Sequence, residues 1–361
     1  MPGSGIDAGD QLAARQYDDR AFREYADKLI LKPLMGTSME SIIQIKENLN
    51  KFPGDQDTFP LRNNLDGKGV EDDSDLEGQE EELVFNDFSV TAKIFKNAVL
   101  SKGQLTERRG AFALKEEALD ALTTWAAQRV EDLLFEDWHR INTVIFGAAT
   151  EVQKDAWLAE NSDRVLFGAT TANNPSNDHS ASLLNVDGAA DTFSTAIISL
   201  ARRRAQLADP QIRPIRLEGG EEIYCMLVHN LAARDLKEST AWQQAQRDAM
   251  PRGLDNPIFK GMMGMWDGVV LKESKKVPLL DSVGAAGIDV AANFLVGAQS
   301  LVMEHVSLPM RPKSKLILQE ELFDYQSRWG VAAFFGMAHG KANFNSKDHG
   351  TSIIYTAAVE D

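Results

Sequence analysis

The amino-acid sequence predicts an α+β protein, because helical and strand patterns alternate along its 361 residues in no regular order. Three stretches carry this prediction. Residues 112–141 place apolar side chains at helical spacing, residues 88–98 alternate apolar and polar side chains as a half-buried strand does, and residues 223–228 form the short apolar run of a buried strand. The sequence shows neither a strand–helix–strand rhythm nor an internal repeat.

Residues 1–56 show no compact apolar core. Helical spacing predicts one helix over residues 11–31 and a second, short helix over residues 38–45, and Lys32-Pro33 breaks the chain between them. We therefore expect residues 1–56 to form an arm that lies along other parts of the protein.

Residues 57–103 are predicted to form a long two-armed hairpin. Pro60 confines the opening arm, residues 58–62, to the edge of a sheet, because proline has no N–H to donate to a neighbouring strand. From Thr58 to Phe88 the chain has ten acidic and two basic residues, and glycines punctuate the tip. A tip with so few apolar residues cannot order itself by burial. We expect it to rest on a neighbouring copy of the same chain.

The helix predicted over residues 112–141 contains no glycine or proline. At about 1.5 Å per residue it would be roughly 45 Å long, enough to brace a whole domain. Its apolar positions at helical spacing are Leu114, Ala118, Leu122, Trp125, Ala126, Val130, Leu133, Leu134, Trp138 and Ile141.

The second half of the chain mixes both kinds of element. Residues 146–185 are expected to be irregular, with a loop over residues 173–178, and a helix over residues 191–208 ends before Pro210. Residues 283–306 are predicted to be an apolar helix despite three glycines. Strands are predicted over residues 223–228, 269–271, 316–318 and 353–355.

The acidic tip invites comparison with a calcium-binding loop. Asp73, Asp75, Glu77 and Gly78 occupy the first, third, fifth and sixth positions of an EF-hand loop. The twelfth position, which supplies a bidentate glutamate in that motif, is Val84. The mismatch favours a solvated acidic loop, and no metal site is predicted.

Other reactive residues also lack the partners that their chemistry needs. Glu136 and His139 make half of a di-iron motif whose second half is absent from the sequence, so His139 is expected on a helix surface or an interface. Cys225 lies in an apolar strand, where a buried, unreactive thiol is expected. Arg202-Arg203-Arg204 is interpreted as the polar side of a helix, with a contact to DNA or to a neighbour's hairpin as the alternative. We predict no catalytic residue and no cofactor.

Charge and composition limit the partners and the compartment. A net charge of −16 disfavours binding to nucleic acid, which depends on neutralising phosphates, but it is compatible with enclosing DNA. A single cysteine suits a reducing compartment. The N-terminus has no signal peptide, and the most apolar long window, residues 283–306, contains polar side chains that disfavour a membrane span. We expect a soluble, intracellular protein.

Short motifs in a fixed order from residue 59 to the C-terminus resemble a known family. They are Leu65-Asp66-Gly67-x-Gly69-Val70, Leu76-Glu77-Gly78-x-Glu80-Glu81, Val228-His229-Asn230 with Asp235-Leu236-Lys237 and Trp242, Asn256-Pro257-Ile258-Phe259-x-Gly261-x-x-Gly264-x-x-x-Gly268-Val269, and Asp348-His349-Gly350 before Ile353 and Thr356-Ala357-Ala358. With the arm, the hairpin and the long helix, the chain resembles tailed-phage major capsid proteins of the N-four-type family, which have the Hong Kong ninety-seven-type capsid fold.

The resemblance implies a division of the chain and a role for each part. Residues 1–56 would be the N-terminal arm, 57–103 the extended loop over the adjacent subunit, 104–204 the peripheral domain with its spine helix, 205–325 the axial domain, and 326–361 strands returning to the peripheral domain. The residues implied in inter-subunit assembly are those of the extended loop: Leu65, Gly67, Gly69, Leu76, Glu77, Gly78, Glu80 and Glu81. Leu122, Trp125, Leu133 and Trp138 are assigned to the spine helix, and Asn256, Pro257, Phe259, Gly261 and Gly268 to the axial domain.

The implied function is assembly of a virion. Hexamers and pentamers of this chain would close into an icosahedral shell around double-stranded DNA in the host bacterial cytoplasm, with portal and scaffolding or decoration proteins as further partners and no membrane. Some relatives join a loop lysine to a neighbour's asparagine. Lys68 with Asn343 or Asn345 would be the residues here, although no local motif supports the bond and a free Lys68 is favoured.

Two alternatives remain open at the level of the sequence. An encapsulin-type compartment shell has the same fold but encloses an enzyme cargo instead of DNA. A soluble enzyme would be a monomer or small oligomer with a pocket lined by carboxylates, so particle images, nucleic-acid content and sizing chromatography separate the three.

Overall fold

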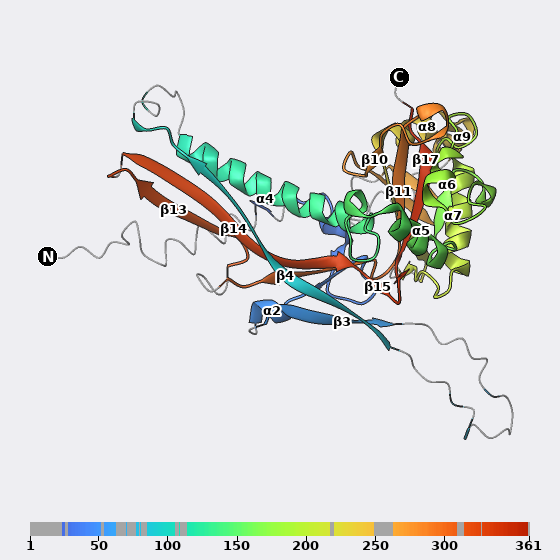
Figure 1. The fold of residues 1–361 in the computed structure, drawn as a ribbon, viewed down its shortest axis with the longest axis horizontal. Coiled ribbons are helices and arrows are strands. Elements are labelled where there is room, and N and C mark those ends of the chain that lie inside the picture. The colour runs from blue at the N-terminus through green and yellow to red at the C-terminus, as the bar shows by residue number, and fades with distance from the viewer. Residues whose placement is uncertain are drawn as a thin grey trace.

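The computed structural model describes residues 24–25, 28–51, 54–62, 70, 77–78, 80, 85–104, 108, 114–216, 220–248, 263–308, 314–325 and 327–359. The molecule is elongated, with a broad body at one end and a long, narrow extension made of β4, β13, β14 and α4 at the other (Figure 1). Two mixed sheets organise these parts. One apolar cluster contains residues of both sheets, and a second packs the body sheet against its helices.

A seven-stranded sheet runs from the body into the extension. Its order is β1-β2-β12-β14-β4-β3, and β13 also pairs with β14. The long strand β14 pairs with β13 along its first half and with β12 along its second half. The bounds are β1 Met35–Gly36, β2 Ile43–Lys46, β3 Gln56–Arg62, β4 Phe85–Leu100, β12 Leu301–Val306, β13 Ile317–Phe323 and β14 Arg328–Lys341.

The body is built on an eight-stranded sheet ordered β5-β17-β11-β7-β9-β8, with β10 on β11 and β6 on β7. Its strands are β5 Val165–Phe167, β6 Ile215–Arg216, β7 Glu222–Val228, β8 Gly264–Trp266, β9 Val269–Glu273, β10 Leu279–Leu280, β11 Val290–Val296 and β17 Thr351–Ala357. A separate hairpin pairs β15 Asn343–Phe344 with β16 Lys347–Asp348.

Helices cover both sheets, as Figure 1 shows. They are α2 Asn48–Lys51, α4 Leu114–Trp138, α5 Glu151–Glu160, α6 His179–Leu184, α7 Thr195–Leu207, α8 Asn230–Glu238 and α9 Thr240–Asp248. Short 3-10 turns are η1 Lys32–Leu34, η2 Phe146–Ala148, η3 Thr171–Asn173 and η5 Ala285–Gly287.

The long helix α4 confirms the predicted spine. Glu116 and Glu117 lie in its first turn, where their charge favours the positive end of the helix dipole. Leu122, Leu133 and Trp138 are all less than 5% exposed. The helix ends before Ile141, which instead forms a bridge with Val144, so its length is about 38 Å at 1.5 Å per residue.

Two predicted helices are strands. Residues 38–45 contain β2, which pairs in parallel with β12, and residues 283–306 contain β11 and β12. Every residue of β11 and β12 is buried, so both faces of these strands are covered and most of their side chains are apolar. Such a run has no two-residue alternation, and periodicity alone cannot distinguish it from a buried helix.

The stretch predicted as irregular, residues 146–185, holds α5, β5 and α6. The start of α5 has a sequence signal that the prediction missed. Thr150 and Gln153 form a capping box, in which each side chain accepts a hydrogen bond from the other residue's backbone N–H. The loop from Asn174 to Asp178 lies where composition placed it.

Several other predictions are confirmed with shifted ends. The strands expected at 223–228, 269–271, 316–318 and 353–355 correspond to β7, β9, β13 and β17, and the helix expected at 191–208 is α7. Most of the helix predicted over residues 11–31 lies outside the described residues. The domain boundaries remain a prediction; both sheets take strands from each side of residue 325.

Candidate assembly surfaces

The root of the predicted hairpin is an antiparallel pair of β3 and β4. The register runs from Gln56 opposite Thr91 to Arg62 opposite Phe85. Since β3 is the last strand in the sheet order, Pro60 does lie at an edge, as predicted. Phe59 is fully buried in a small cluster with residues of the body: Leu49, Val90, Val302, Val306 and Ala338.

Polar contacts add to this apolar anchor. Lys46 Nζ donates to the carbonyl oxygen of Thr58 at 2.5 Å and lies 4.1 Å from the centre of the Phe59 ring. Gln299 Nε2 donates to the carbonyl oxygen of Pro60 at 3.1 Å. Asp57 accepts a hydrogen bond from Asn48 Nδ2 at 3.1 Å and lies 3.5 Å from Lys46 Nζ. The root of the hairpin is therefore tied to β2, α2 and the turn before β12.

Three of the predicted tip residues are described. Glu77, Gly78 and Glu80 are exposed, and the Gly78 N–H donates to Glu80 Oε2 at 2.7 Å. Gly78 has a φ of +89°, a conformation that glycine adopts without a Cβ clash. The other predicted tip residues lie outside the described residues: Leu65, Gly67, Gly69, Leu76 and Glu81.

The alternation predicted along β4 divides its side chains between two different surroundings. Phe95 stacks on Phe335, with 5.2 Å between ring centres, and Trp125 of α4 lies 5.9 Å from Phe335. Phe88, Val90 and Ala92 face the opposite side, where α2 and β12 contribute the cluster around Phe59. Ile94 was predicted to be buried with them, but it lies beyond that cluster and is 61% exposed.

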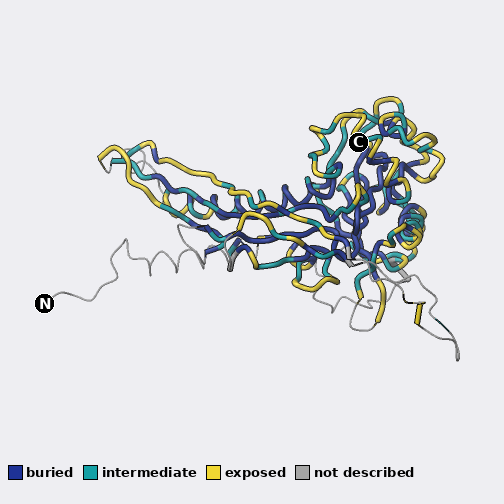
Figure 2. The backbone as a smooth tube through the Cα atoms, turned by 60° about the horizontal axis from the view of Figure 1, so that its bottom comes forward, coloured by how far each residue is buried: buried dark blue, intermediate teal, exposed yellow. Residues whose placement is uncertain are grey.

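An exposed apolar surface therefore continues along β4 on the side away from α4. Leu100 is 53% exposed and Phe323 is 41% exposed. Both lie over Gly330, where an added Cβ would be 2.7 Å from the Phe323 ring and 3.5 Å from Leu100. We call Ile94, Leu100 and Phe323 the distal face. Figure 2 shows that exposure increases toward this narrow end of the molecule.

The four residues assigned to the spine helix lie in α4, and three of them belong to the buried core. Trp138 is fully buried, and its indole N–H donates to Ser300 Oγ at 3.2 Å. Trp125 is the one of the four that is partly exposed, and it packs at the edge of the main apolar cluster. The spine therefore holds the extension to the body.

Of the predicted axial residues, Gly268 is described and Asn256, Pro257, Phe259 and Gly261 lie outside the described residues. Gly268 forms the turn between β8 and β9 with a φ of +68°, and an added Cβ would be 3.2 Å from the Arg202 guanidinium. Arg202 itself pairs with Asp267 at 2.5 Å. Arg202 belongs to the predicted polar side of α7, and its pair with Asp267 helps to hold the turn between β8 and β9.

A buried histidine cluster was missed by the sequence analysis. His139, predicted at a surface, is 3% exposed, and both His139 Nε2 and His179 Nε2 lie 3.2 Å from the Tyr355 hydroxyl. Burial lowers the pKa of His139 well below its usual value and lowers that of His179 to about 4. Both rings are therefore neutral at pH 7. Cys225 is buried as predicted, and burial raises the pKa of its thiol to about 12.

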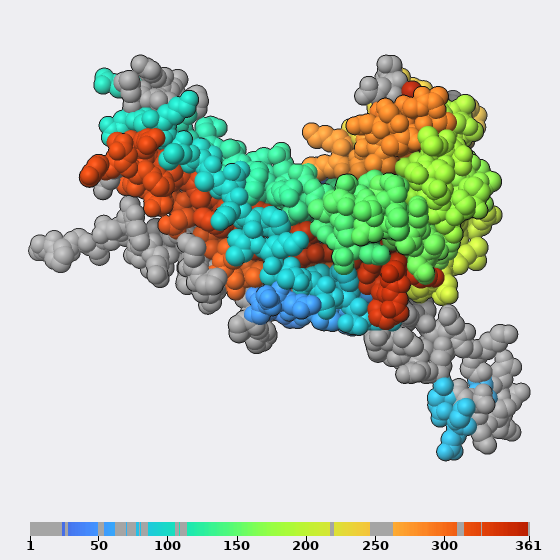
Figure 3. Space-filling view, in the orientation of Figure 1, coloured from blue at the N-terminus to red at the C-terminus, as the bar shows by residue number. Residues whose placement is uncertain are grey.

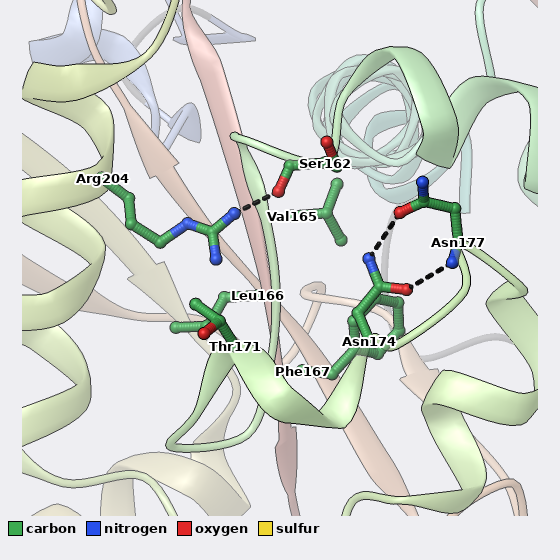
Figure 4. A pocket seen from close by; sticks show the side chains of 8 residues that line it. All are labelled: Ser162, Val165, Leu166, Phe167, Thr171, Asn174, Asn177 and Arg204. Atoms are coloured by element: carbon green, nitrogen blue, oxygen red, sulfur yellow. Dashed lines mark hydrogen bonds between the residues drawn. The ribbon is translucent and has the colours of Figure 1, made fainter.

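A pocket of about 470 Å³ opens between α7 and the loop after β5 (Figure 4). Arg204 contributes the one titratable side chain of its lining, and its guanidinium donates to the Ser162 and Asp163 carbonyl oxygens. Asn174 and Asn177 hydrogen bond to each other at 3.0 Å across the pocket wall. Such a lining offers hydrogen bonds and places no base beside the Ser162 or Thr171 hydroxyl.

Metal and membrane sites were also sought in the part of the chain that the structure describes. No group of three His, Cys, Asp or Glu side chains there is placed to hold a metal ion. Within the same residues, no helix has both the length and the apolar character needed to cross a membrane.

Comparison with known proteins gives one consistent result. The sequence profile of the phage capsid protein family matches residues 6–360. The major capsid protein of Pseudomonas phage KPP25 is 26% identical over 362 residues, covering 93% of each chain. Among solved structures, the capsid of cyanophage Pam1 has a TM-score of 0.77 at 25% identity, covering 92% of each chain. The capsid of Ralstonia phage GP4 has a TM-score of 0.72 at 26% identity, covering 91% of this chain and 90% of that one.

These similarities extend over the hairpin root, the spine and both sheets alike. They confirm the resemblance that the sequence motifs carry, including the fold, and they favour a phage shell over an encapsulin-type compartment. The chain belongs to the phage capsid protein family.

Proposed function

We propose that this phage capsid protein builds the head of the virion through head-to-tail contacts, in which the hairpin tip around Glu77 and Glu80 lies on the distal face of the adjacent copy. Copies joined in this way form hexamers and pentamers, which close into an icosahedral shell around double-stranded DNA. The observation that carries the proposal is that one strand, β4, starts at the hairpin root and ends at the distal face, on opposite sides of the molecule (Figure 3).

The length of β4 separates the two surfaces. Its 16 residues span roughly 50 Å at about 3.3 Å per residue. Unlike surfaces at opposite ends of one chain favour head-to-tail contacts, which close into rings when the rotation between copies allows it. Each contact needs only modest strength, because many linked contacts in one shell act together.

Charge and apolar character support the fit. The hairpin has ten acidic and two basic residues between Thr58 and Phe88. Lys96 and Arg328 lie beside the distal face and form no ion pair with another described residue. The exposed Glu321, which lies opposite Gly330, also borders this face. The apolar side chains and the two cations beside them suit a partner with acidic and apolar side chains, because opposite charges steer the encounter.

The remaining assignments are part of the same proposal. The loop residues around Glu77 and Glu80 contact the neighbouring copy, residues 104–204 and 326–361 form the peripheral domain, and residues 205–325, with Gly268, form the axial domain at the capsomer centre. The net charge of −16 supports enclosure of DNA without sequence-specific binding. Assembly takes place in the host bacterial cytoplasm, and portal, scaffolding or decoration proteins are further partners.

A covalent bond from Lys68 is not part of the proposal. Asn343 Nδ2 donates to Asn142 Oδ1 at 3.1 Å, so this amide already has a partner within its own chain. Denaturing electrophoresis of assembled shells tests the point, and bands larger than the monomer would show the bond.

The distal face is tested by placing a charge on it. Leu100→Glu and Phe323→Glu should leave a folded subunit that no longer forms shells, measured by sizing chromatography and negative-stain images. Val152→Glu is the matched control, because Val152 is 77% exposed on α5, away from the distal face. Closed shells at normal yield from both distal-face variants would contradict the proposal. Nucleic acid within particles from infected cells tests the DNA assignment.

A further inference from the structure

Glu304 is an unusual residue at the root of the hairpin. It lies in the middle of β12 with a fully buried side chain. Its Oε1 accepts a hydrogen bond from the Leu49 N–H at 2.6 Å, whereas no described residue donates to Oε2. A buried carboxylate oxygen without a donor is costly, because burial takes the charge out of water and no protein hydrogen bond replaces those that water made.

The group that Glu304 faces is another carboxyl. Adjacent residues of α2 donate to the two carboxyl groups, Asn48 Nδ2 to Asp57 of β3 and the Leu49 N–H to Glu304, so Asp57 and Glu304 lie side by side at this helix. A hydrogen bond between two carboxyl groups requires one proton, since two carboxylates offer acceptors only. Asp57 has Lys46 at 3.5 Å and is the better-solvated partner. A proton shared by the pair would therefore reside on Glu304, whose Oε2 has no donor from a described residue and could donate it to Asp57.

The other charged groups near Glu304 do not neutralise its carboxylate in place of the proton. Lys46 Nζ donates a hydrogen bond to the Thr58 carbonyl oxygen and lies 3.5 Å from the Asp57 carboxylate. Glu47 pairs with Lys315 at 2.8 Å, and the neighbouring His305 is held neutral by burial, with its pKa lowered to about 4. Burial is the main reason that the pKa of Glu304 is raised to about 7; the charge of Asp57 acts in the same direction, and the Leu49 N–H and Lys46 act against it. Asp57 has a lowered pKa in spite of burial, because the Thr58 N–H and Lys46 favour its charged form.

Because Asp57 and Glu304 lie at the hairpin root, loss of their shared proton would affect how β3 is attached to the body. Asp57 lies at the start of β3, an edge strand that, among the described residues, pairs with β4 alone. Apart from this pairing, β3 is held to the body by contacts that involve side chains. Lys46 contacts Asp57 at the start of the strand, and further along the Phe59 ring is buried and the Gln299 side chain donates to the Pro60 carbonyl oxygen.

We propose that the proton shared by Glu304 and Asp57 latches the start of β3 to the body, and that its loss places two like charges in contact and loosens the hairpin root. The latch itself is a property of the single subunit. Its consequence for the shell, a pH-dependent setting of the hairpin, rests on the proposed function of that hairpin.

The unassembled full-length chain provides the test. Infrared difference spectra of the wild type from pH 5 to 9 should show the C=O band of a buried protonated carboxyl that disappears near pH 7, and Glu304→Gln should lack that band. Amide exchange in residues 54–62, corrected for the intrinsic pH dependence, should be about thirtyfold faster at pH 8.5 than at pH 5.5 in the wild type if opening returns the pKa of Glu304 from about 7 to its ordinary 4.5.

Two variants separate the latch from general charge effects. Glu304→Gln keeps a hydrogen bond to Asp57 without a titrating group, so exchange in residues 54–62 should become independent of pH after correction. Glu47→Gln, which removes the pair with Lys315, should behave as the wild type. Retention of the wild-type pH dependence by Glu304→Gln, or absence of the carboxyl band from the wild type, would overturn the latch. Neither result depends on the distal-face variants. These experiments can therefore refute the latch without refuting the proposed contact between the hairpin and the distal face.

Discussion

Lys341 and Asp348 form an ion pair of 2.7 Å that is closed off from solvent, with both residues 1% exposed. Trp157 covers the pair. Its indole N–H donates to Asp348 Oδ2 at 3.3 Å, and its ring centre lies 5.3 Å from Lys341 Nζ. Lys341 also donates to the Arg140 carbonyl oxygen at 2.5 Å. The pair joins the end of β14 to β16, near the place where the chain passes from one sheet to the other.

Removing the lysine charge from this pair should be strongly destabilising. Burial lowers the pKa of Lys341 and raises that of Asp348, so each charge depends on the other. Lys341→Met should lower the free energy of unfolding by about 3–5 kcal/mol, because it leaves a buried carboxylate without a counterion. Denaturant unfolding of the subunit measures this. Glu238→Gln, which breaks an exposed pair with Arg234, should change stability by less than about 1 kcal/mol; equal losses in the two variants would refute the prediction.

A side chain at Gly297 should also destabilise the fold. This glycine lies between β11 and β12, and an added Cβ would be 2.3 Å from the Arg213 carbonyl oxygen and 2.9 Å from the Ile212 side chain. Gly297→Ala forces the backbone apart, so we expect a loss of about 1–3 kcal/mol. Gly147→Ala is the control, since an added Cβ there meets no atom within 4 Å. A melting temperature of Gly297→Ala equal to that of the control would show that this turn tolerates a side chain.

Acid should destabilise the subunit through its buried histidines. Burial, with a smaller effect from the Lys315 charge, lowers the pKa of His305 from 6.5 to about 4. Between these values the unfolded chain binds a proton that the folded chain does not, so stability falls as the pH decreases from 6.5 to 4. The expected loss from His305 alone is about 3 kcal/mol.

The comparison of wild type with His305→Gln isolates this contribution. The variant cannot titrate, so its free energy of unfolding should fall by about 3 kcal/mol less between pH 7 and pH 4, measured by denaturant titration. Glu304 acts in the opposite direction, because its raised pKa favours the folded state at lower pH, but it is present in both proteins. His229→Gln, at a half-buried position, should flatten the profile less. Parallel profiles for wild type and His305→Gln would contradict the assignment.

The sequence alone determined the elements that have one clear period or a distinct composition. The spine helix was predictable because apolar residues recur at helical spacing from Leu114 to Trp138 without a helix breaker, and the edge position of β3 followed from Pro60. The ordered motifs from Leu65 to Asp348 also identified the family, because their order over most of the chain is specific even though each motif is short.

Only the tertiary structure decided whether a continuous apolar run is a strand or a helix, and which polar residues meet. β11 and β12 are apolar because both of their faces are covered by other elements, and this burial removes the alternation by which strands are recognised. Glu304 and Asp57, or His139 and Tyr355, are distant in sequence, and local patterns contain no information about a proton or a hydroxyl shared between them. The distal face arises for the same reason, since the exposure of Leu100 depends on where α2 stops covering the side of the sheet that faces away from α4.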